Sequence, residues 1–235
     1  MVVLNVESDI KDIVCNSKSV FYLLTGEEKK ELEKHISLYH YSKNEVIFNQ
    51  GDKPAAFLIL VSGRVKIFME GIGGREQIIR MAGSMEIIGF SSLFAEKNHI
   101  STAVSLEDSL VCSVNYHFIT DVALRNYYFS KQIIRKLSEE LCFSHCRTVS
   151  LTQKHIRGRL AETLILLKEK YGYENDGVTI RIYLSREDIA NLSNMTTSNA
   201  IRTLSTFVKE KVIEVDGRKI GIIDFGRLER ISKLG

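Results

Sequence analysis

Short apolar stretches that end at glycines fill the first half of the chain. Residues 56–61 end at Gly63, and the alternating residues 65–69 end at Gly71. The other stretches of this kind are 46–48, 77–81, 86–88, 101–104 and 109–114. Many short strands at close spacing, with glycines in the turns, are typical of an antiparallel barrel or jelly roll. The pattern predicts an antiparallel β-roll that ends near Val114, preceded by a charged helix over residues 27–39.

After the strands, the hydrophobic period becomes helical. Apolar and small residues over 121–150 alternate at spacings of three and four, which is the seam pattern of a coiled coil. The seam comprises Tyr127, Ile134, Leu137, Leu141, Ser144, Thr148 and Leu151. A stripe of this length needs a partner, and the simplest one is a second copy of the chain. The alternative is a long helix that packs on its own roll.

The C-terminal part has the signals of two short helices and a hairpin. Ser185 precedes a helix with an acid three residues later, and Thr196 can cap a second helix, residues 197–209. Asp216-Gly217 lies between two strand-like stretches and is a strong hairpin signal. An earlier helix is expected over 157–170, and the second helix has the apolar face Ala200, Leu204, Phe207 and Val208. Helix, turn, helix and a two-stranded wing predict a winged helix-turn-helix.

The charge of the chain is concentrated at this end. The formal net charge is +3, but residues 151–235 alone hold 15 Lys and Arg against 11 Asp and Glu. A basic C-terminal part beside a nearly neutral remainder suggests that only this part meets a polyanion.

The second helix of this pair carries chemistry that suits duplex DNA. Its outward positions have hydroxyl, amide and guanidinium groups and no acid before Glu210, so they can approach base edges and phosphates. Basic residues beyond it can contact the DNA backbone. The candidate DNA-binding residues are Ser185, Arg186, Thr196, Thr197, Ser198, Asn199, Ile201, Arg202, Lys209, Arg218 and Lys219. The alternative is an ordinary helical hairpin with a solvated face.

Composition excludes several other classes of protein. The 235 residues include only four cysteines, at 15, 112, 142 and 146, which is too few for a disulfide scaffold. No apolar run approaches the roughly 18 residues of a membrane-spanning helix, and no signal core follows the N-terminus. We therefore expect an intracellular, cytoplasmic protein with no membrane partner. A cupin-like metalloenzyme is the alternative from another class, but no His-x-His pair is present.

With these motifs assembled, the chain resembles the Crp/Fnr family of bacterial transcription regulators from about Glu27 onward. The resemblance rests on Gly51-Asp52, on 61–65 and the Gly89…Leu93-Phe94 stretch in the roll, on the helical 158–164 segment, and on the helix-turn-helix that opens at Ser185. The family implies an α+β chain with a β-roll sensor domain over 1–120, a long dimerisation helix over 121–150 and a winged helix-turn-helix over 151–235.

The resemblance also implies the binding partners and the way in which DNA is recognised. A homodimer would read a palindromic operator, with the dimer seam at Ile134, Leu137, Leu141 and Thr148 and RNA polymerase as a further partner. Thr197, Ser198 and Arg202 fall at the family's principal base-reading positions, with Ile201 between them. The family often has arginine or glutamate where this chain has Thr197 or Ser198, so a different operator is expected.

The sensor positions depart from the cyclic-nucleotide-binding members of the family. Those members carry a glutamate and an arginine where this chain has Phe90 and Ile100, and the missing arginine removes the charge partner of a buried phosphate. We expect no cyclic AMP binding, and either a less polar small-molecule effector or none. The candidate effector pocket is Gly89, Phe90, Ser91, Ile100, Ser101, Ser144 and His145.

Cofactor chemistry is not indicated by the remaining residues. The cysteines lack the cluster that an iron–sulfur centre needs, so we expect no metal or cofactor. Cys142 and Cys146, with His145 beside them, are interpreted as packing thiols, and a redox or metal pair is the alternative. Ser144 and His145 either contact an effector across the seam or set its register. A haem- or redox-sensing member of the family stays open as an alternative.

Overall fold

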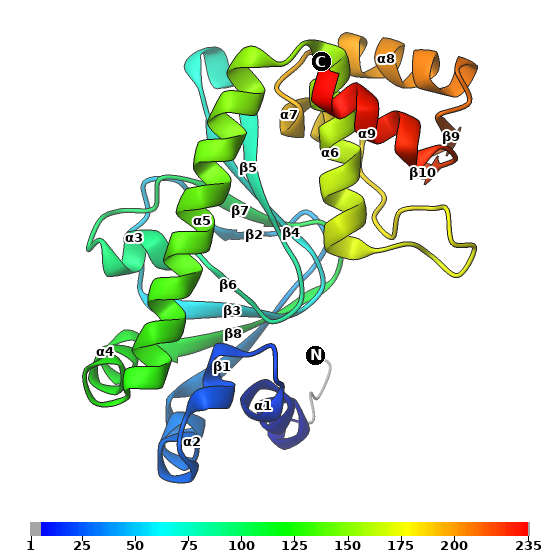
Figure 1. The fold of residues 1–235 in the computed structure, drawn as a ribbon. Helices are drawn as coiled ribbons and strands as arrows, with labels where there is room; N and C mark the ends of the chain where they lie inside the picture. The colour runs from blue at the N-terminus through cyan, green and yellow to red at the C-terminus, as the bar shows by residue number, and fades with distance from the viewer. Residues whose placement is uncertain (1–5, 235) are drawn as a thin grey trace. The chain divides into compact units, whose positions relative to one another are not determined.

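The computed structural model describes residues 6–234, which form two compact units (Figure 1). The first unit extends to Ile72 and resumes over Ile79–Leu141. The second unit contains the hairpin tip Gly73–Ile78 and the chain from Cys142 onward. No helix of the described residues is both long enough and apolar enough to cross a membrane.

Two four-stranded sheets make up the β-roll of the first unit. One sheet has the strand order β1 (Ile36–Tyr41), β8 (Ser109–Asn115), β3 (Ala56–Ser62) and β6 (Glu86–Ile88). The other has the order β2 (Val46–Phe48), β7 (Thr102–Ser105), β4 (Val65–Glu70) and β5 (Glu76–Ala82). The pairs β1–β8, β3–β8, β3–β6, β2–β7 and β4–β7 are all antiparallel, so the predicted antiparallel roll is confirmed.

Strand β3 shows how the roll is packed. Phe57, Ile59 and Val61 point to a core shared with helices, whereas Leu60 points to a core between the two sheets. Successive side chains of a strand face opposite ways, so a strand buried on both faces has an unbroken apolar sequence. This double burial explains why residues 56–61 contain no polar position.

The charged helix predicted over 27–39 is shorter than expected. Helix α2 (Gly26–Leu32) is capped at Thr25 by a reciprocal capping box with Glu28, and the 3₁₀ turn η2 (Glu33–His35) follows. Strand β1 then begins at Ile36 and pairs with β8 over its whole length. The prediction was wrong at its C-terminal end, because ladder pairing with a strand about seventy residues away overrides local helix propensity.

Helices cover the outer face of the first sheet. Besides α2, they are α1 (Val6–Cys15), the 3₁₀ helix η1 (Val20–Leu23), α3 (Phe90–Phe94) and α4 (Tyr116–Arg125). Phe21 of η1 stacks on Phe129 with ring centroids 6.3 Å apart and lies 6.0 Å from the Phe57 ring. The N-terminal helices therefore belong to the core of the roll.

The long helix starts later than the predicted residue 121. Chain 116–153 forms two helices, α4 and α5 (Tyr127–Gln153), separated at Asn126. Asn126 has extended backbone angles, and its side-chain oxygen accepts from the Phe129 amide at 3.0 Å. Its amide nitrogen donates to Glu28 at 2.7 Å. Asn126 therefore caps the start of α5, and its bond to Glu28 links this start to the capping box of α2.

Helix α5 has one buried and one exposed side. Phe129 and Ile133 lie in the core of the roll, and Leu137 packs against the same core. On the other side, Ile134 is 63% exposed and Leu141 57%. Leu137, predicted in the seam with these two, is half-buried and continues the roll-facing row at spacings of four. The helix therefore packs one apolar row on its own roll and leaves a second apolar row exposed.

The second unit is a winged helix-turn-helix, as predicted. Its elements are α6 (Ile156–Tyr171), α7 (Arg186–Leu192), α8 (Thr197–Lys209), β9 (Ile213–Asp216), β10 (Lys219–Ile222) and α9 (Phe225–Leu234). The wing is joined by a short bridge between Thr179 and Gly221. Helix α9 packs on α6 and was not foreseen from the sequence.

Asn126→Ala tests the junction of α4 and α5. The variant loses the α5 cap and the bond to Glu28, so we expect thermal or urea unfolding of the roll to show a loss of about 1–3 kcal/mol. Asn126→Asp keeps the cap acceptor but places a second carboxylate beside Glu28. It should be destabilised mainly at neutral pH and recover as acid protonates the pair. Equal stability of all three proteins would contradict this role of Asn126.

Candidate nucleic-acid interface and sensor region

Both helices of the helix-turn-helix start at the capping residues expected from the sequence. The Ser185 hydroxyl accepts from the Asp188 amide at 2.9 Å and donates to the Asp188 carboxylate at 2.6 Å. Thr196 accepts from the Asn199 amide at 3.3 Å. The buried Ser193 in the turn donates to Thr163 of α6 at 3.0 Å, which holds the turn on the helix beneath it. The two helix starts are therefore fixed by local bonds.

Helix α8 buries one face and exposes the polar face predicted for DNA. Ala200, Leu204 and Phe207 are buried as expected. Val208 was predicted with them, but it is 40% exposed, because it lies off the buried row. The exposed positions of the helix are Thr197, Ser198, Ile201, Arg202, Ser205, Val208 and Lys209, and the half-buried Asn199 accepts from the Arg202 guanidinium at 3.2 Å.

The wing turn presents two cations. Gly217 has a φ of 55° in the turn between β9 and β10, and the neighbouring Arg218 and Lys219 are exposed. Arg186, also a candidate DNA-binding residue, has a partner within the unit. Its guanidinium donates to the Gly217 carbonyl at 2.6 Å, so it ties the start of α7 to the wing. Within this unit, the polar face of α8 and the basic wing are both accessible.

An ion pair that sequence reasoning missed holds the far end of α8. Arg157 of α6 donates two bonds to Glu210, at 2.9 and 2.6 Å, and its guanidinium lies 5.0 Å from the Phe207 ring centroid. The hydrogen bonds from Arg157 hold the pKa of the Glu210 carboxyl below its ordinary value. No local pattern links two residues 53 positions apart.

The proposed sensor residues of the roll lie around a tight turn. Gly89 has a φ of 67°, and a Cβ there would lie 2.8 Å from the His99 ring and 3.0 Å from Phe48. His99 stacks on Phe48 with centroids 3.9 Å apart, and burial lowers the pKa of its imidazole, although the charge of Asp52 acts the other way. Ser101, two residues after His99 in the sequence, is buried, whereas Ser91 is exposed.

Phe90 and Ile100 do not form one apolar lining. Phe90 is 2% exposed and lies in the core beneath the helices, whereas Ile100 is 54% exposed. The sequence predicts an apolar pocket lined by both side chains, but the Phe90 side chain is buried in the core of the roll. Together with Leu93, its side chain packs α3 on the sheet, because burial of apolar side chains is favourable.

The remaining candidate residues lie on α5 in the second unit. Ser144 and His145 are exposed, and the Ser144 carbonyl accepts from Thr148 at 2.9 Å. Cys142 and Cys146 are exposed free thiols, so the interpretation of both as packing residues is wrong for the single chain. Cys112 is different, since burial raises the pKa of its thiol to about 12. Among the described residues, no three potential ligands gather as a metal site would require.

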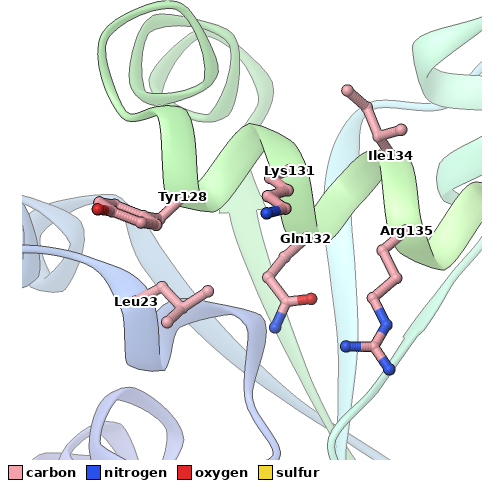
Figure 2. A pocket seen from close by; sticks show the side chains of 6 residues that line it. All are labelled: Leu23, Tyr128, Lys131, Gln132, Ile134 and Arg135. Atoms are coloured by element: carbon pink, nitrogen blue, oxygen red, sulfur yellow. The ribbon is translucent and has the colours of Figure 1, made fainter.

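A concavity of about 450 Å³ opens beside the first turns of α5 (Figure 2). It is lined by Leu23, Tyr128, Lys131, Gln132, Ile134 and Arg135. Figure 2 shows Tyr128 and Leu23 across one end and the Ile134 side chain pointing away from Leu23. Ile134 thus belongs both to this hollow and to the exposed stripe of α5.

Comparisons with known proteins agree on both units. Residues 38–126 match the family described as the cyclic nucleotide-binding domain, and residues 158–231 match the Crp-like helix-turn-helix domain. Electron transport regulator A of Shewanella oneidensis is 30% identical over 193 residues, covering 81% of this chain and 76% of the relative. The chain belongs to the Crp/Fnr family of transcription regulators.

Other Crp/Fnr relatives and solved structures are also similar. The fumarate and nitrate reduction regulatory protein of Vibrio cholerae is 26% identical over 81% of this chain and 76% of its own. The structure of FixK2 from Bradyrhizobium japonicum has a TM-score of 0.76 at 20% identity, covering 83% of this chain and 96% of that one. A mutant of CooA from Carboxydothermus hydrogenoformans has a TM-score of 0.73 at 18% identity, covering 95% of each chain. These two structures support the fold.

Membership of the Crp/Fnr family decides between the classes left open by the sequence. The family consists of DNA-binding transcription regulators that act as dimers, and it is not a family of enzymes. The prediction of a regulator is confirmed, and the cupin-like alternative receives no support.

Gly89→Ala tests the packing of the sensor turn. The new Cβ would meet His99 and Phe48 at a left-handed backbone position, so we expect a loss of roughly 1–3 kcal/mol in the stability of the roll, measured by thermal unfolding. Gly73→Ala is the matched control, because Gly73 has a φ of 79° with no atom within 4 Å of the added Cβ. A variant at Gly89 no less stable than the control would contradict close packing at the turn.

Proposed function

We propose that this chain acts as a homodimer that reads a palindromic DNA operator, with the start of α8 of each copy in the major groove. The observation that carries the proposal is the polar, acid-free face of α8, with Thr197, Ser198 and Arg202 exposed together. The Thr196 cap leaves the first amides of the helix directed at an approaching phosphate. Lys209, Arg218 and Lys219 are exposed cations that can add sequence-independent contacts.

The exposed side of α5 supports the dimer. Tyr127, Ile134, Leu141 and Thr148 follow one another at intervals of seven and are all exposed. A heptad row on a helix meets the same row of a second helix in a coiled coil. The proposed organisation is a sensor over 1–120, dimerisation along the exposed row of α5 within 121–150 and a DNA-binding part over 151–235, with RNA polymerase as a further partner.

The signal reaches the DNA reader through the roll, and cyclic AMP is not the expected ligand. Ile100 supplies no charge for a cyclic phosphate, and Phe90 is part of the core. An effector held in the roll around Gly89, Ser91 and Ser101 would be a less polar molecule than cyclic AMP. Selecting duplexes from a random pool with effector-free protein tests the proposal. A palindromic motif would support it, and enrichment of single half-sites would contradict the dimer.

Arg202→Ala tests base reading by α8. A guanidinium that binds one base in the groove discriminates by about 1–3 kcal/mol, so this variant should lose preference at one position of each half-site. Lys209→Ala should instead weaken binding to all sequences alike. It should also reduce the slope of log affinity against log salt concentration by about one, because one phosphate contact is lost. Fluorescence anisotropy on a set of single-base operator variants separates the two. A uniform loss for Arg202→Ala would make it a backbone contact.

Ile134→Asp combined with Leu141→Asp tests the seam. In a dimer, the two new carboxylates would lie against the same carboxylates of the second chain, so we expect monomers in sedimentation. Operator binding should weaken at least a hundredfold, because a monomer contacts only one half-site. Lys136→Asp is the control: Lys136 is exposed but lies off the row through Ile134 and Leu141. Circular dichroism should show folded protein in each case. A dimer that persists in the double variant would place the interface elsewhere.

A further inference from the structure

An exposed isoleucine interrupts the polar face of α8. Ile201 is 48% exposed, and its neighbours on the outward side of the helix are Ser198, Arg202 and Ser205. Its backbone carbonyl accepts from the Ser205 hydroxyl at 3.0 Å, so the backbone is satisfied. The buried face of α8 consists of Ala200, Leu204 and Phe207, whereas the Ile201 side chain is half exposed.

The position of Ile201 places it among the groups expected to meet the bases. It lies in the second turn of α8, directly before Arg202 and three residues after Ser198. In helix-turn-helix proteins the N-terminal turns of the second helix contact base edges. An aliphatic side chain there has no hydrogen bond to offer, so any base preference must come from apolar contact.

The major groove offers one apolar group, the C5-methyl of thymine. We infer that Ile201 is a specificity-determining residue that packs on a thymine methyl in each half-site of the operator. The inference rests on the proposed function, because it needs the start of α8 in the major groove. The polar neighbours fit this arrangement: Arg202 can bind an adjacent purine while Ile201 covers the methyl beside it.

Val208 provides an internal comparison. It is the other exposed aliphatic residue on this side of α8, 40% exposed and seven residues after Ile201. Two helical turns bring it close to the same angular position but about 10 Å further along the axis. It lies in the last turn, away from the end of the helix that reads bases, so it should make no base contact.

Replacing thymine by deoxyuridine tests the inference directly, since it removes the methyl and leaves every hydrogen-bonding group. The duplex is the site enriched from the random pool, and each thymine is replaced in turn. For the unaltered protein we expect one position per half-site at which the replacement weakens binding about three- to fivefold, the value of one buried methyl group. Other thymines should give little change.

The protein variants assign the effect to a side chain. Ile201→Ala should bind thymine and deoxyuridine duplexes equally at that position, whereas Ile201→Val and Val208→Ala should keep a clear difference. If no thymine is sensitive in the unaltered protein, or if Ile201→Ala keeps the sensitivity, Ile201 does not read a methyl and the inference is wrong. Failure to enrich any site would instead overturn the proposed function, and this inference with it.

Discussion

Only one side of helix α5 can pack on the β-roll, and this constraint determines which apolar residues of the helix stay exposed. Phe129, Ile133 and Leu137 follow one another at intervals of four and turn toward the roll core, where Phe21 stacks on the first of them. Once that row is buried, the row through Ile134 and Leu141 must face outward. A large exposed apolar row on a regulator marks a surface for another chain.

The start of α5 is fixed by the same core. Asn126 interrupts the helix and bonds both to the first turn of α5 and to Glu28 of α2. Burial alone would raise the pKa of the Glu28 carboxyl, but bonds from Thr25 and Asn126 and the charge of Arg125 lower it overall. This carboxylate therefore stabilises the junction above the ordinary pKa of a glutamate. Its contribution is lost as the pH falls through the lowered pKa.

Much of the fold was predictable because its signals are local. The caps at Ser185 and Thr196 and the Asp216-Gly217 turn each act over a few residues, and they delimited the helix-turn-helix and the wing correctly. The features that were missed depend on contacts between distant residues. The Asn126 break combines a local cap with a distant bond to Glu28 of α2, and the Arg157–Glu210 pair joins α6 to the end of α8. Phe90 could not be assigned from the sequence for a similar reason. An apolar residue gives the same sequence signal whether its side chain lines a pocket or fills a core, and in the structure Phe90 fills the core.

The two rows of α5 have a consequence for DNA binding that is measurable without knowing the effector. If the exposed row joins two copies, each bound duplex carries two readers. Sedimentation of the protein with a duplex that contains one selected operator gives the number of chains per complex. Two chains per duplex, with no intermediate of one chain at low protein concentration, are expected from a preformed dimer. A saturated complex with one chain per duplex would contradict the role given to α5.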